Sequence, residues 1–529
     1  MANPDSTGPA ISEVRPASDT GVPRPGDEKT AISAASSFAP GEDAGASTWW
    51  SSTRRRFGFP SDTSPYSEPR GPWAKLWKFF KFLGPGAIVS VAYVDPDNYQ
   101  SAISSGASFQ YKLLFMVLVS NIVAIFLQSL CVKLGTVTGL DLAQMNHRYL
   151  PRWLDLFIYA IAEACIVCTD IGQVVGTAIA LNILIPKLPL PAACVVSVAD
   201  TLIILLFYKS NGEMRRIRIF EIFIALLVLA IFITICVALA MISAPAGPVF
   251  KGFLPSRDIF VSTGLYESCA ILGGTLMPHA IYVGTALQQP RLYEYDVKHN
   301  LSPNATPTTS TDSLYRPSLR AIKSCLSYSI AELTFTLFTV AVFVNSALII
   351  ISGASFYDPD SDDEISGDLY DLYDLFSTVI APAAGTLFAV SLLFSGISAG
   401  IVATMAGQMI MEGALKIRIN PFLRRLATRC VAIIPAFIVA VSVGKDGLSQ
   451  ALVACNYILA IGLIFITFPL VYYTSREKYM RVPTDDGTGT VSMRNSIPTA
   501  AVAWIIWTVV VVMDVATVVL IGLGITSDD

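Results

Sequence analysis

The sequence predicts an all-α membrane protein that crosses the bilayer many times. Of its 529 residues, 53% are hydrophobic and only 14% are charged, a composition too apolar for an ordinary soluble protein. The apolar residues gather in stretches of the roughly 20 residues that a transmembrane helix needs. We count eleven such stretches: Phe79–Ile103, Leu113–Leu134, Leu154–Leu184, Ala192–Tyr208, Ile219–Ile242, Leu265–Leu287, Leu326–Ile351, Ala384–Met411, Ala427–Val443, Leu452–Tyr473 and Val502–Leu523.

Loop charges predict the orientation of these spans. Lysine and arginine resist transfer across the bilayer, so short loops rich in them stay in the cytosol. A basic group precedes the first span and others occupy alternate loops, whereas the acidic loop 358–364 falls on the opposite side. We therefore expect a cytoplasmic amino terminus and, after eleven crossings, a carboxyl terminus on the other side. The basic residues are Arg54, Arg55, Arg56, Lys75, Lys78, Lys81, Arg215, Arg216, Arg218, Arg291, Arg316, Lys323, Lys416, Arg424, Arg425, Arg476 and Lys478.

Several classes of function are not supported. All nine cysteines lie in or against apolar stretches without paired loop spacing, so they are interpreted as core residues and not as disulfides or a zinc site. No basic, aromatic-rich patch suggests a nucleic-acid partner. No phosphate-binding glycine loop and no nucleophile–base pair outside the membrane suggests an enzyme or a resident cofactor.

The first span contains Asp95-Pro96-Asp97-Asn98 in the middle of apolar sequence. A charged side chain near the centre of a bilayer costs a few kcal/mol, so such residues persist mainly where they face a cavity or an ion. Proline removes a backbone donor and breaks the helix, which frees carbonyl oxygens for a ligand. The motif therefore predicts a broken helix at an ion-binding site.

A second break is expected in the sixth span, at Gly273-Gly274-Thr275-Leu276-Met277-Pro278-His279. The first and sixth spans each open a set of five helices, and an odd number of crossings inverts the second set relative to the first. Broken helices at matching positions of inverted halves are typical of a secondary transporter whose substrate lies between the repeats. We expect a disordered cytoplasmic tail over 1–72 and a transporter domain over 73–525. In that domain the first repeat covers about 79–242, the second about 265–473 and the extra helix about 502–523.

The two breaks offer a mixed set of ligand atoms. Asp95 and Asn98 are three residues apart and project to one side of a helix with hard oxygens. Unwinding would add the carbonyl oxygens of Ala92 and Gly274, and Met277 adds a soft sulfur. Oxygen with thioether ligation favours manganese, iron or later divalent metals over calcium and magnesium. Simpler interpretations are that Met277 only packs in the core and that His279 only bonds a neighbouring helix.

These residues resemble the NRAMP family of proton-coupled divalent metal transporters. Gly84-Pro85-Gly86 through Val91-Ala92-Tyr93 to Asp95-Pro96-Asp97-Asn98-Tyr99 is similar to the family's first-helix motif, and Met277-Pro278-His279 is similar to its sixth-helix motif. Further similar segments are Val344-Asn345-Ser346-Ala347, Ala406-Gly407-Gln408, Met411-Glu412-Gly413, Arg424-Arg425 and Thr428-Arg429. The resemblance covers about residues 73–525 and implies the LeuT-like inverted repeat of five plus five helices with an eleventh helix.

The resemblance also implies residue roles. Asp95, Asn98 and Met277 would ligate the metal, with the backbone oxygens of Ala92 and Gly274 contributing in different states. His279, Asp170 and Glu163 would belong to the proton route toward the cytosol, with Arg429 or its neighbours as counter-charges. Glu163 and Asp170 are seven residues apart, so they lie on one face of their helix, although a purely structural buried ion pair is the alternative.

Several positions depart from the family pattern. Asp97 replaces a glycine, Ala280 an asparagine and Gln173 a glutamate, Gly284 stands where a histidine is common, and Ile397 and Asn456 stand where glutamines are common. Glutamine and glycine cannot exchange protons near neutral pH, so we hypothesise that metal binding is retained while proton coupling is weakened or rerouted. Two roles are open for Asp97, as a substitute proton acceptor or as an added attraction for the cation. Tentative additions to the site are Asp97, Asn345, Gln173 and Asn456.

The favoured function is a monomeric secondary transporter of divalent transition metals working by alternating access in the lipid bilayer, with protons as the coupling ion and no resident cofactor. Two alternatives remain. One is a relative with a changed substrate, such as magnesium or an amino acid, although Asp95 and Asp97 would repel a carboxylate. The other is a metal sensor that binds without transport.

Overall fold

The computed structural model describes residues 93–198, 226, 229–230, 232–301, 315–357, 367–380, 382–417, 419–484 and 489–523, all within the structural unit Thr63–Asp529. The predicted tail 1–72, the residues up to Ala92, the basic cluster Arg215-Arg216-Arg218 and the acidic loop 358–364 lie outside the described residues. The first, fourth and fifth expected spans are therefore described only in part, as α4 (Pro96–Phe109), α8 (Leu190–Val196) and the helix Phe232–Met241.

The predicted membrane character is confirmed. In the described part of the chain, eight helical segments are long and apolar enough to span a bilayer, and they coincide with the other eight expected spans. They are α5 (Leu114–Thr138), α7 (Arg152–Leu184), α12 with α13 (Ser262–Leu276 and Pro278–Ala286), α15 with η2 and α16 (Leu319–Thr336, Leu337–Val342 and Phe343–Ser355), α18 (Pro382–Leu415), α19 (Pro421–Ser442), α20 (Lys445–Ser475) and α21 (Ile497–Gly522).

Shorter elements connect these helices, and local chemistry fixes where several of them begin and end. α5 ends at Gly139, whose left-handed φ of 70° lets its N–H reach the Gly135 carbonyl at 2.9 Å. A capping box of Asp141 and Gln144 opens α6. The connecting elements are α6 (Leu142–Tyr149), α11 (Ala246–Gly252), η1 (Arg257–Phe260), α14 (Gln289–Lys298), α17 (Leu369–Leu375) and η3 (Phe376–Ile380).

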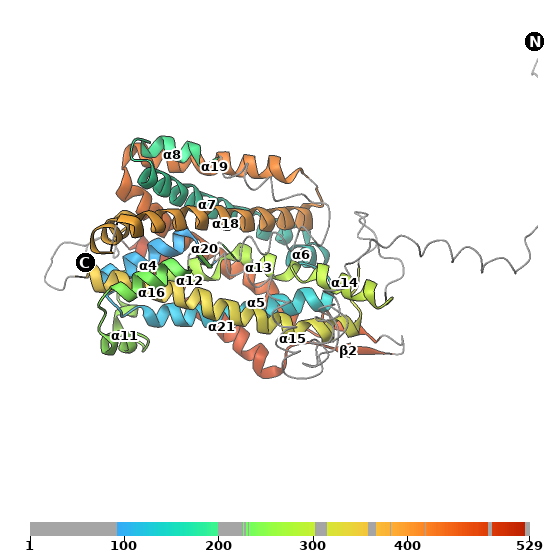
Figure 1. Cartoon of the computed structure of the whole chain (residues 1–529). Coiled ribbons are helices and arrows are strands. Elements are labelled where there is room, and N and C mark those ends of the chain that lie inside the picture. Colours follow the sequence, from blue (N-terminus) through green and yellow to red (C-terminus); the bar gives the residue numbers. More distant parts are fainter. Residues whose placement is uncertain are drawn as a thin grey trace, which may run out of the picture. The chain divides into compact units, whose positions relative to one another are not determined.

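A small hairpin departs from the all-α expectation. β1 (Arg481–Pro483) pairs antiparallel with β2 (Thr490–Ser492), and Val482 lies opposite Val491. The hairpin joins α20 to α21, and Asn495 donates its N–H to the Thr474 carbonyl at 2.9 Å. It lies at the end of the bundle that carries α6 and α14 (Figure 1). The strands are too short to give a periodic pattern in the sequence.

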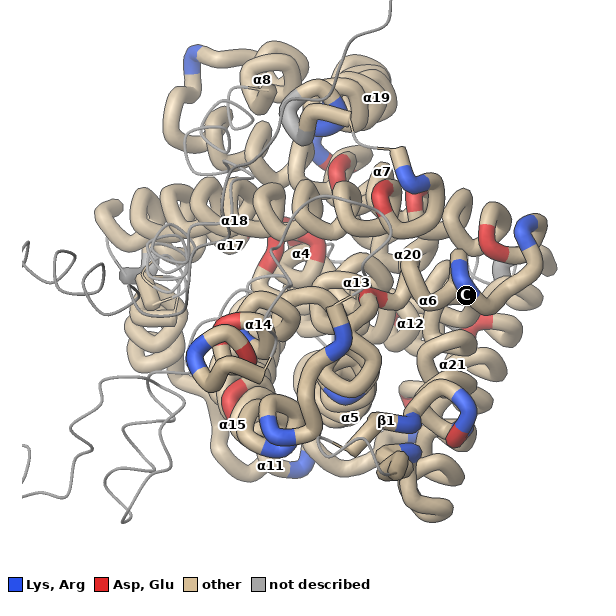
Figure 2. Tube along the Cα trace, turned by 90° about the vertical axis from the view of Figure 1, so that its right-hand side faces the viewer, with Lys and Arg blue, Asp and Glu red and all other residues tan. Residues whose placement is uncertain are grey.

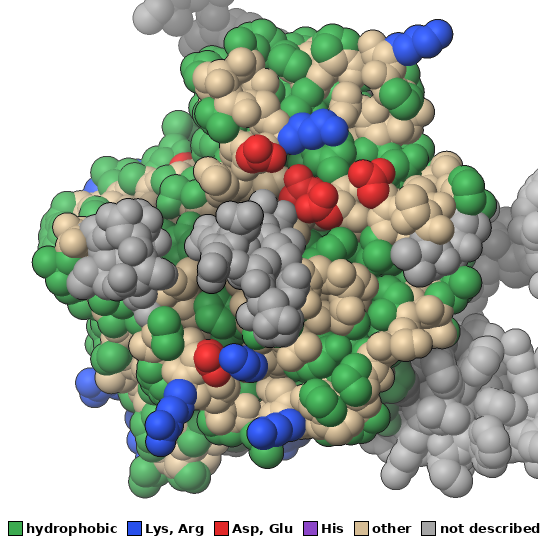
Figure 3. All heavy atoms as spheres, turned by 90° about the vertical axis from the view of Figure 1, so that its left-hand side faces the viewer, with side chains coloured by type: hydrophobic (Ala, Val, Ile, Leu, Met, Phe, Trp, Pro, Cys, Tyr) green, Lys and Arg blue, Asp and Glu red, His purple; other side chains and the backbone are tan. Residues whose placement is uncertain are grey.

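The long helices run side by side and enclose the broken ones (Figure 1). α4 packs against α16, α12 and α20, and α7 packs against α18, α20 and α19. Viewed along the bundle, acidic positions at the start of α4 lie near its centre and basic residues are scattered over the near end (Figure 2). Figure 3 looks onto the opposite end, where several carboxylates gather on the surface.

The outer faces of α19 and α21 are apolar, as expected for contact with lipid. On α19, Ile434 and Val441 are more than half exposed, and on α21 so are Ile505 and Val512. Exposed apolar side chains over whole helices are unfavourable in water but suit a hydrocarbon environment. The interior helices α12 and α13 are instead almost entirely buried within the protein.

Candidate functional site

The first helix break is formed around Asp95. This residue is the N-cap of α4 with extended backbone, Pro96 occupies the first helical position, and the Asp95 Oδ1 accepts from the Asn98 N–H at 3.0 Å. The preceding carbonyl, that of Val94, accepts a 2.6 Å hydrogen bond from the Ser395 hydroxyl of α18. In the part of the span that the structure describes, Tyr93 to Asp95 are not helical and the helix begins at Pro96, as the expected break requires, and α18 holds the backbone just before it.

The second break is formed by Met277. Its backbone (φ −5°, ψ 113°) is not helical, α12 ends just before it at Leu276, and α13 begins just after it at Pro278. Proline suits the start of α13 because its missing N–H has no partner at that position. Met277 itself is fully buried, so its sulfur faces the protein interior and not lipid.

The two breaks converge through Gly274 and Asn98. A methyl group added to Gly274 would lie 2.4 Å from the Asn98 Oδ1 and 2.8 Å from the Asn456 Nδ2, so a larger residue here would force these amides to shift. The Asn456 Nδ2 in turn donates to the Asp97 carbonyl and to the Ser101 hydroxyl, both at 2.9 Å. A single polar cluster therefore joins α4, α12 and α20 in the membrane interior.

The free atoms of this cluster suit a cation. Asp95 is 1% exposed, and its Oδ2 has no hydrogen-bond partner in the protein. A buried carboxylate oxygen without a partner is unfavourable unless a cation or a proton satisfies it. Among the described residues no three His, Cys, Asp or Glu side chains form a metal cluster, so a site here would use carboxylate, amide, thioether and backbone oxygens. Ala92, the other expected backbone ligand, lies outside the described residues.

Asp97 is as buried as Asp95, but its carboxylate points toward α7 and not toward Gly274. A methyl group added to Gly172 of α7 would lie 1.9 Å from its Oδ1, so the carboxylate packs against α7. Both of its oxygens lack a partner in the described structure. The side chain thus adds negative charge beside the break without lying against Gly274.

A polar route leaves the breaks along α7. The His279 Nδ1 lies 3.4 Å from the Thr169 hydroxyl, and the next residue, Asp170, forms a fully buried ion pair with Arg425. Arg425 also donates to the Gln173 Oε1 at 3.0 Å. These contacts connect α13, α7 and α19 through hydrogen-bonding groups.

Arg429 and Glu163 complete the basic and acidic groups of this route. Arg429 is buried and donates to the Asp170 main-chain oxygen at 3.1 Å and to the Gln173 Oε1 at 3.4 Å. Glu163 pairs with Arg424 at 2.5 and 2.8 Å. The family resemblance implied that Arg429 or its neighbours are the counter-charges. The structure places two of these neighbours, Arg425 and Arg424, on the two carboxylates.

Two further departures from the family pattern, Gly284 and Ile397, and the tentative site residue Asn345 have described surroundings. The space beside Gly284, where a histidine is common, holds the Gln128 side chain, whose Oε1 would lie 2.1 Å from an added methyl group. Ile397 is buried in the same apolar cluster as Met277. Asn345 is buried on α16, which packs against α4, and its Oδ1 has no partner in the protein.

Two polar contacts near the site had no assigned role in the sequence. Ser395 donates its hydroxyl hydrogen to the Val94 carbonyl, and no local feature of the sequence signals this contact. Glu267 of α12 accepts from the Ser104 and Ser105 hydroxyls of α4 at 2.9 and 3.0 Å. An acidic residue inside an apolar span indicates a functional or structural role from the sequence alone. Glu267 could therefore have been singled out from the sequence, but its serine partners could not.

Comparisons with known proteins agree on one family. A model described as "Natural resistance-associated macrophage protein-like" matches residues 86–520. The chain is 46% identical to the manganese transporter SMF1 of Saccharomyces cerevisiae, over 76% of this chain and 72% of that protein. It is 42% identical to the manganese transporter pdt1 of Schizosaccharomyces pombe (86% and 89%) and 44% identical to the iron transporter SMF3 of S. cerevisiae (78% and 85%).

A solved structure shows the same fold. The manganese transporter of Eremococcus coleocola, in complex with an aromatic bis-isothiourea substituted compound, superposes with a TM-score of 0.69 at 28% identity. The match covers 87% of this chain and 90% of that one. The LeuT-like fold class with two broken helices is thereby confirmed.

Proposed function

Because the chain belongs to the Nramp family, we propose that it is a secondary transporter of divalent transition-metal cations, manganese or iron in type, that works by alternating access. The observation that carries the proposal is the convergence of the two helix breaks at Gly274 and Asn98. The manganese and iron transport stated for its relatives supports the choice of cation.

Each ligand class has a distinct role in this proposal. Asp95 supplies the charge that attracts the cation, and Asn98 and the backbone oxygens of Gly274 and Ala92 replace water with neutral oxygen. The Met277 sulfur provides discrimination, because hard cations such as Ca²⁺ and Mg²⁺ gain nothing from a thioether. A site of mixed softness would release the metal more readily than an all-carboxylate cage, which transport requires.

We place the proton route along His279, Thr169 and Asp170, with Glu163 farther along α7. Its contacts support this assignment, since the ion pair of Asp170 with Arg425 is fully buried and lies one residue from Thr169. Gln173 binds both Arg425 and Arg429 but cannot carry a proton itself. Coupling is accordingly proposed to be weaker than in relatives that keep a titratable group there.

The loop charges support a cytoplasmic amino terminus and an outer carboxyl terminus. The protein is proposed to be a monomer that crosses the membrane several times. The end of the bundle with α6, α14 and the hairpin (Figure 1) is proposed to face the cytosol, because basic residues lie on or beside these elements: Arg148 on α6, Lys298 on α14, Lys416 directly after α18, and Arg476 and Lys478 between α20 and the hairpin.

Uptake by the full chain in proteoliposomes tests the metal assignment. We expect uptake of Mn²⁺, Fe²⁺ and Cd²⁺ but little of Mg²⁺ or Ca²⁺, and Asp95→Ala should abolish it. Asp446→Ala removes an exposed carboxylate at the start of α20 and should leave uptake unchanged. Metal binding without any uptake would instead favour a sensor, and preferred uptake of Mg²⁺ would favour the relative with a changed substrate.

Two further measurements test metal selectivity and proton coupling separately. If Met277→Ala leaves the preference for Mn²⁺ over Ca²⁺ unchanged, the thioether has no selective role. Acidification of the same liposomes, measured together with Mn²⁺ uptake, reports coupling. A fixed, robust proton-to-metal ratio would refute weakened coupling while leaving the transport proposal intact.

A further inference from the structure

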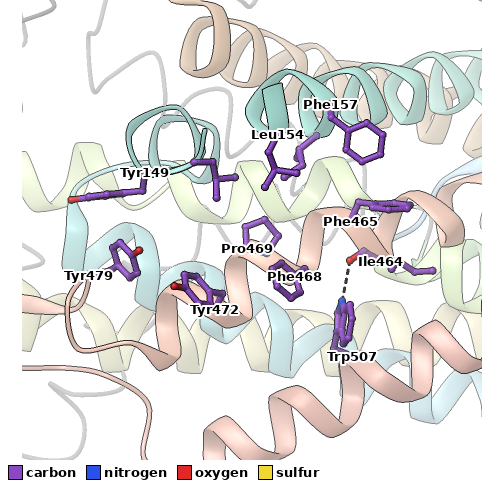
Figure 4. A pocket seen from close by; sticks show the side chains of 12 residues that line it. Tyr149, Leu154, Phe157, Ile464, Phe465, Phe468, Pro469, Tyr472, Tyr479 and Trp507 are labelled. Carbon is purple, nitrogen blue, oxygen red and sulfur yellow. Dashed lines mark hydrogen bonds between the residues drawn. The ribbon is translucent and has the colours of Figure 1, made fainter. Parts of the chain in front are cut away.

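A large apolar groove lies apart from the metal site, at the end of the bundle that carries α6 and the hairpin. It has a volume of about 520 Å³ and is bounded by the start of α7, the last turns of α20 and the middle of α21. Figure 4 shows the Leu154, Phe157, Phe465, Phe468 and Trp507 side chains around it. Phe157, Phe465 and Phe468 are each between 38% and 46% exposed, so the groove opens to the outside of the protein.

The distance from the inner end of the groove to the cation beyond its mouth is close to the thickness of one leaflet of a bilayer. The inner end is at Ile464 and Trp507, the outer end on α20 is at Tyr472, and the Arg476 guanidinium lies over the Tyr472 ring. Twelve residues separate Ile464 from Arg476, which at about 1.5 Å per residue gives roughly 18 Å. Half of the hydrocarbon core of a bilayer is about 15 Å. A hydrocarbon chain that enters beside Arg476 would therefore reach the inner end.

The inner end offers no free polar group from its tryptophan. The Trp507 indole N–H donates to the Ile464 carbonyl at 3.0 Å, and this bond is drawn in Figure 4. The remaining surface there consists of aliphatic and aromatic carbon. Such a surface favours a flexible hydrocarbon over a water-soluble ligand, because it satisfies no polar atom of a guest.

The outer end carries three cations above an aromatic rim. Arg148, Arg476 and Lys478 lie over the rings of Tyr149, Tyr472 and Tyr479, with distances to the ring centroids of 5.6, 5.4 and 5.5 Å. Those rings line the groove. All three basic side chains are exposed.

The nearest acid in sequence does not neutralise these cations. Glu477, between Arg476 and Lys478, forms its ion pair with Arg481 at 3.0 Å. No ion pair in the described part of the chain involves Arg148, Arg476 or Lys478. The positive charge at the mouth of the groove is therefore available to an external anion.

We propose that this groove binds one anionic phospholipid of the cytoplasmic leaflet. One acyl chain lies between α7, α20 and α21, and the headgroup phosphate and acidic group contact Arg148, Arg476 and Lys478. The combination of an apolar slot one leaflet deep with a basic mouth matches this class of lipid in both parts. The side of the membrane follows from the proposed orientation of the chain.

The groove lies against two helices that also carry residues of the proposed transport site, so a bound lipid could affect transport. It contacts α20, which supplies Asn456 to the polar cluster, and α7, which carries Asp170. A lipid bound to both helices would stabilise their contact.

Lipid binding by the purified full chain tests the inference without any transport measurement. The probes are dioleoyl phosphatidylserine and dioleoyl phosphatidylcholine, which share acyl chains and differ in net charge, added to protein in a neutral detergent. Native mass spectrometry and thermal unfolding are the readouts. We expect phosphatidylserine to bind at least tenfold more tightly and to raise the unfolding temperature more than phosphatidylcholine does.

Two variants locate the site. Arg476→Gln with Lys478→Gln should weaken phosphatidylserine binding by on the order of tenfold to thirtyfold, since each basic residue near a lipid surface contributes a few-fold or more. Lys323→Gln with Lys416→Gln removes two exposed lysines from the same end of the bundle but not from the groove, and should have no effect. Leu154→Trp, which narrows the groove, should weaken binding of both lipids.

Three results would overturn the inference. Equal binding of the two lipids would show only general lipid contact, and an equal loss in both double variants would show general attraction to basic surface. Binding of glycerophosphoserine, the headgroup without chains, as tightly as the lipid would show that the groove has no part in recognition. Because none of these readouts uses metal flux, they fail or succeed independently of the transport proposal.

Discussion

Replacing Gly274 by alanine is the most direct test of the two converging breaks. The added methyl group would lie 2.4 Å from the Asn98 Oδ1 and 2.8 Å from the Asn456 Nδ2. Ordinary contact begins at about 3.4 Å, so the Asn98 amide must move by about 1 Å. A displacement of that size at a binding constellation reduces function by about 10²-fold. We expect the KM for Mn²⁺ uptake to rise between about 10-fold and 100-fold.

Two further glycine substitutions make this experiment specific. Gly247→Ala is the same chemical change in α11, where an added methyl group meets nothing within 4 Å, and it should leave the KM unchanged. At Gly273 the methyl group would lie 2.0 Å from the Asn456 main-chain oxygen. Backbone cannot give way as an amide side chain can, so Gly273→Ala should lower the unfolding temperature, whereas Gly274→Ala should mainly affect metal uptake.

The assay is initial Mn²⁺ uptake into proteoliposomes over a range of concentrations, with equilibrium Mn²⁺ binding measured on the same samples. Thermal unfolding checks that each variant is folded. If folded Gly274→Ala protein binds and transports Mn²⁺ with the unaltered KM, Asn98 is not part of the cation site and the reasoning from the two breaks is wrong.

Further predictions concern the polar groups around the site. Asp170→Asn leaves Arg425 buried without its carboxylate and should destabilise the protein by about 3–5 kcal/mol, whereas the double change with Arg425→Gln should restore part of this in a denaturation series; no difference between the two would contradict the buried pair. Glu267→Ala removes the acceptor of two serine hydroxyls of α4 and should lower stability by about 1–3 kcal/mol, more than Glu267→Gln does. Burial raises the pKa of Asp141 to about 7, so the folded chain holds this proton more tightly than the unfolded one. The stability that results is complete below about pH 4 and is lost as pH rises through about 7. Asp141→Asn, which keeps an N-cap residue, should therefore flatten the fall of the unfolding temperature between pH 5 and 8; an unchanged slope would assign that fall to other groups.

The position of Asp97 illustrates how far sequence reasoning reaches. Its burial followed from its place in an apolar span, and the structure shows it 1% exposed. The direction of the Asp97 side chain could not be predicted from the sequence, because Pro96 fixes the backbone only locally. The packing of α4 on α7, where Gly172 leaves room, turns the carboxylate away from Gly274. Whether Asp97 accepts a proton or attracts the cation stays open to the coupling measurement.

The partner of Asp170 is a second case in which the sequence predicted the kind of residue and the tertiary structure decided which one it is. The sequence indicated a basic partner among Arg429 and its neighbours, because arginines enter the ninth span on the proposed cytoplasmic side. Helical phase and depth then decide which one meets the carboxylate. The structure pairs Arg425 with Asp170, 255 residues apart, and directs Arg429 to the main-chain oxygen of the same residue.

The amino-acid sequence by itself determined the features that depend on neighbouring residues. The length of each apolar stretch sets the spans, and Pro96 and Pro278 set the breaks, because a missing N–H interrupts a helix wherever it occurs. Only the tertiary structure decided which side chains meet across helices, such as Gly274 with Asn98, Ser395 with Val94 and Gln128 with the space beside Gly284. Those contacts depend on the rotation and depth of helices distant in the chain, and a one-dimensional pattern does not record either.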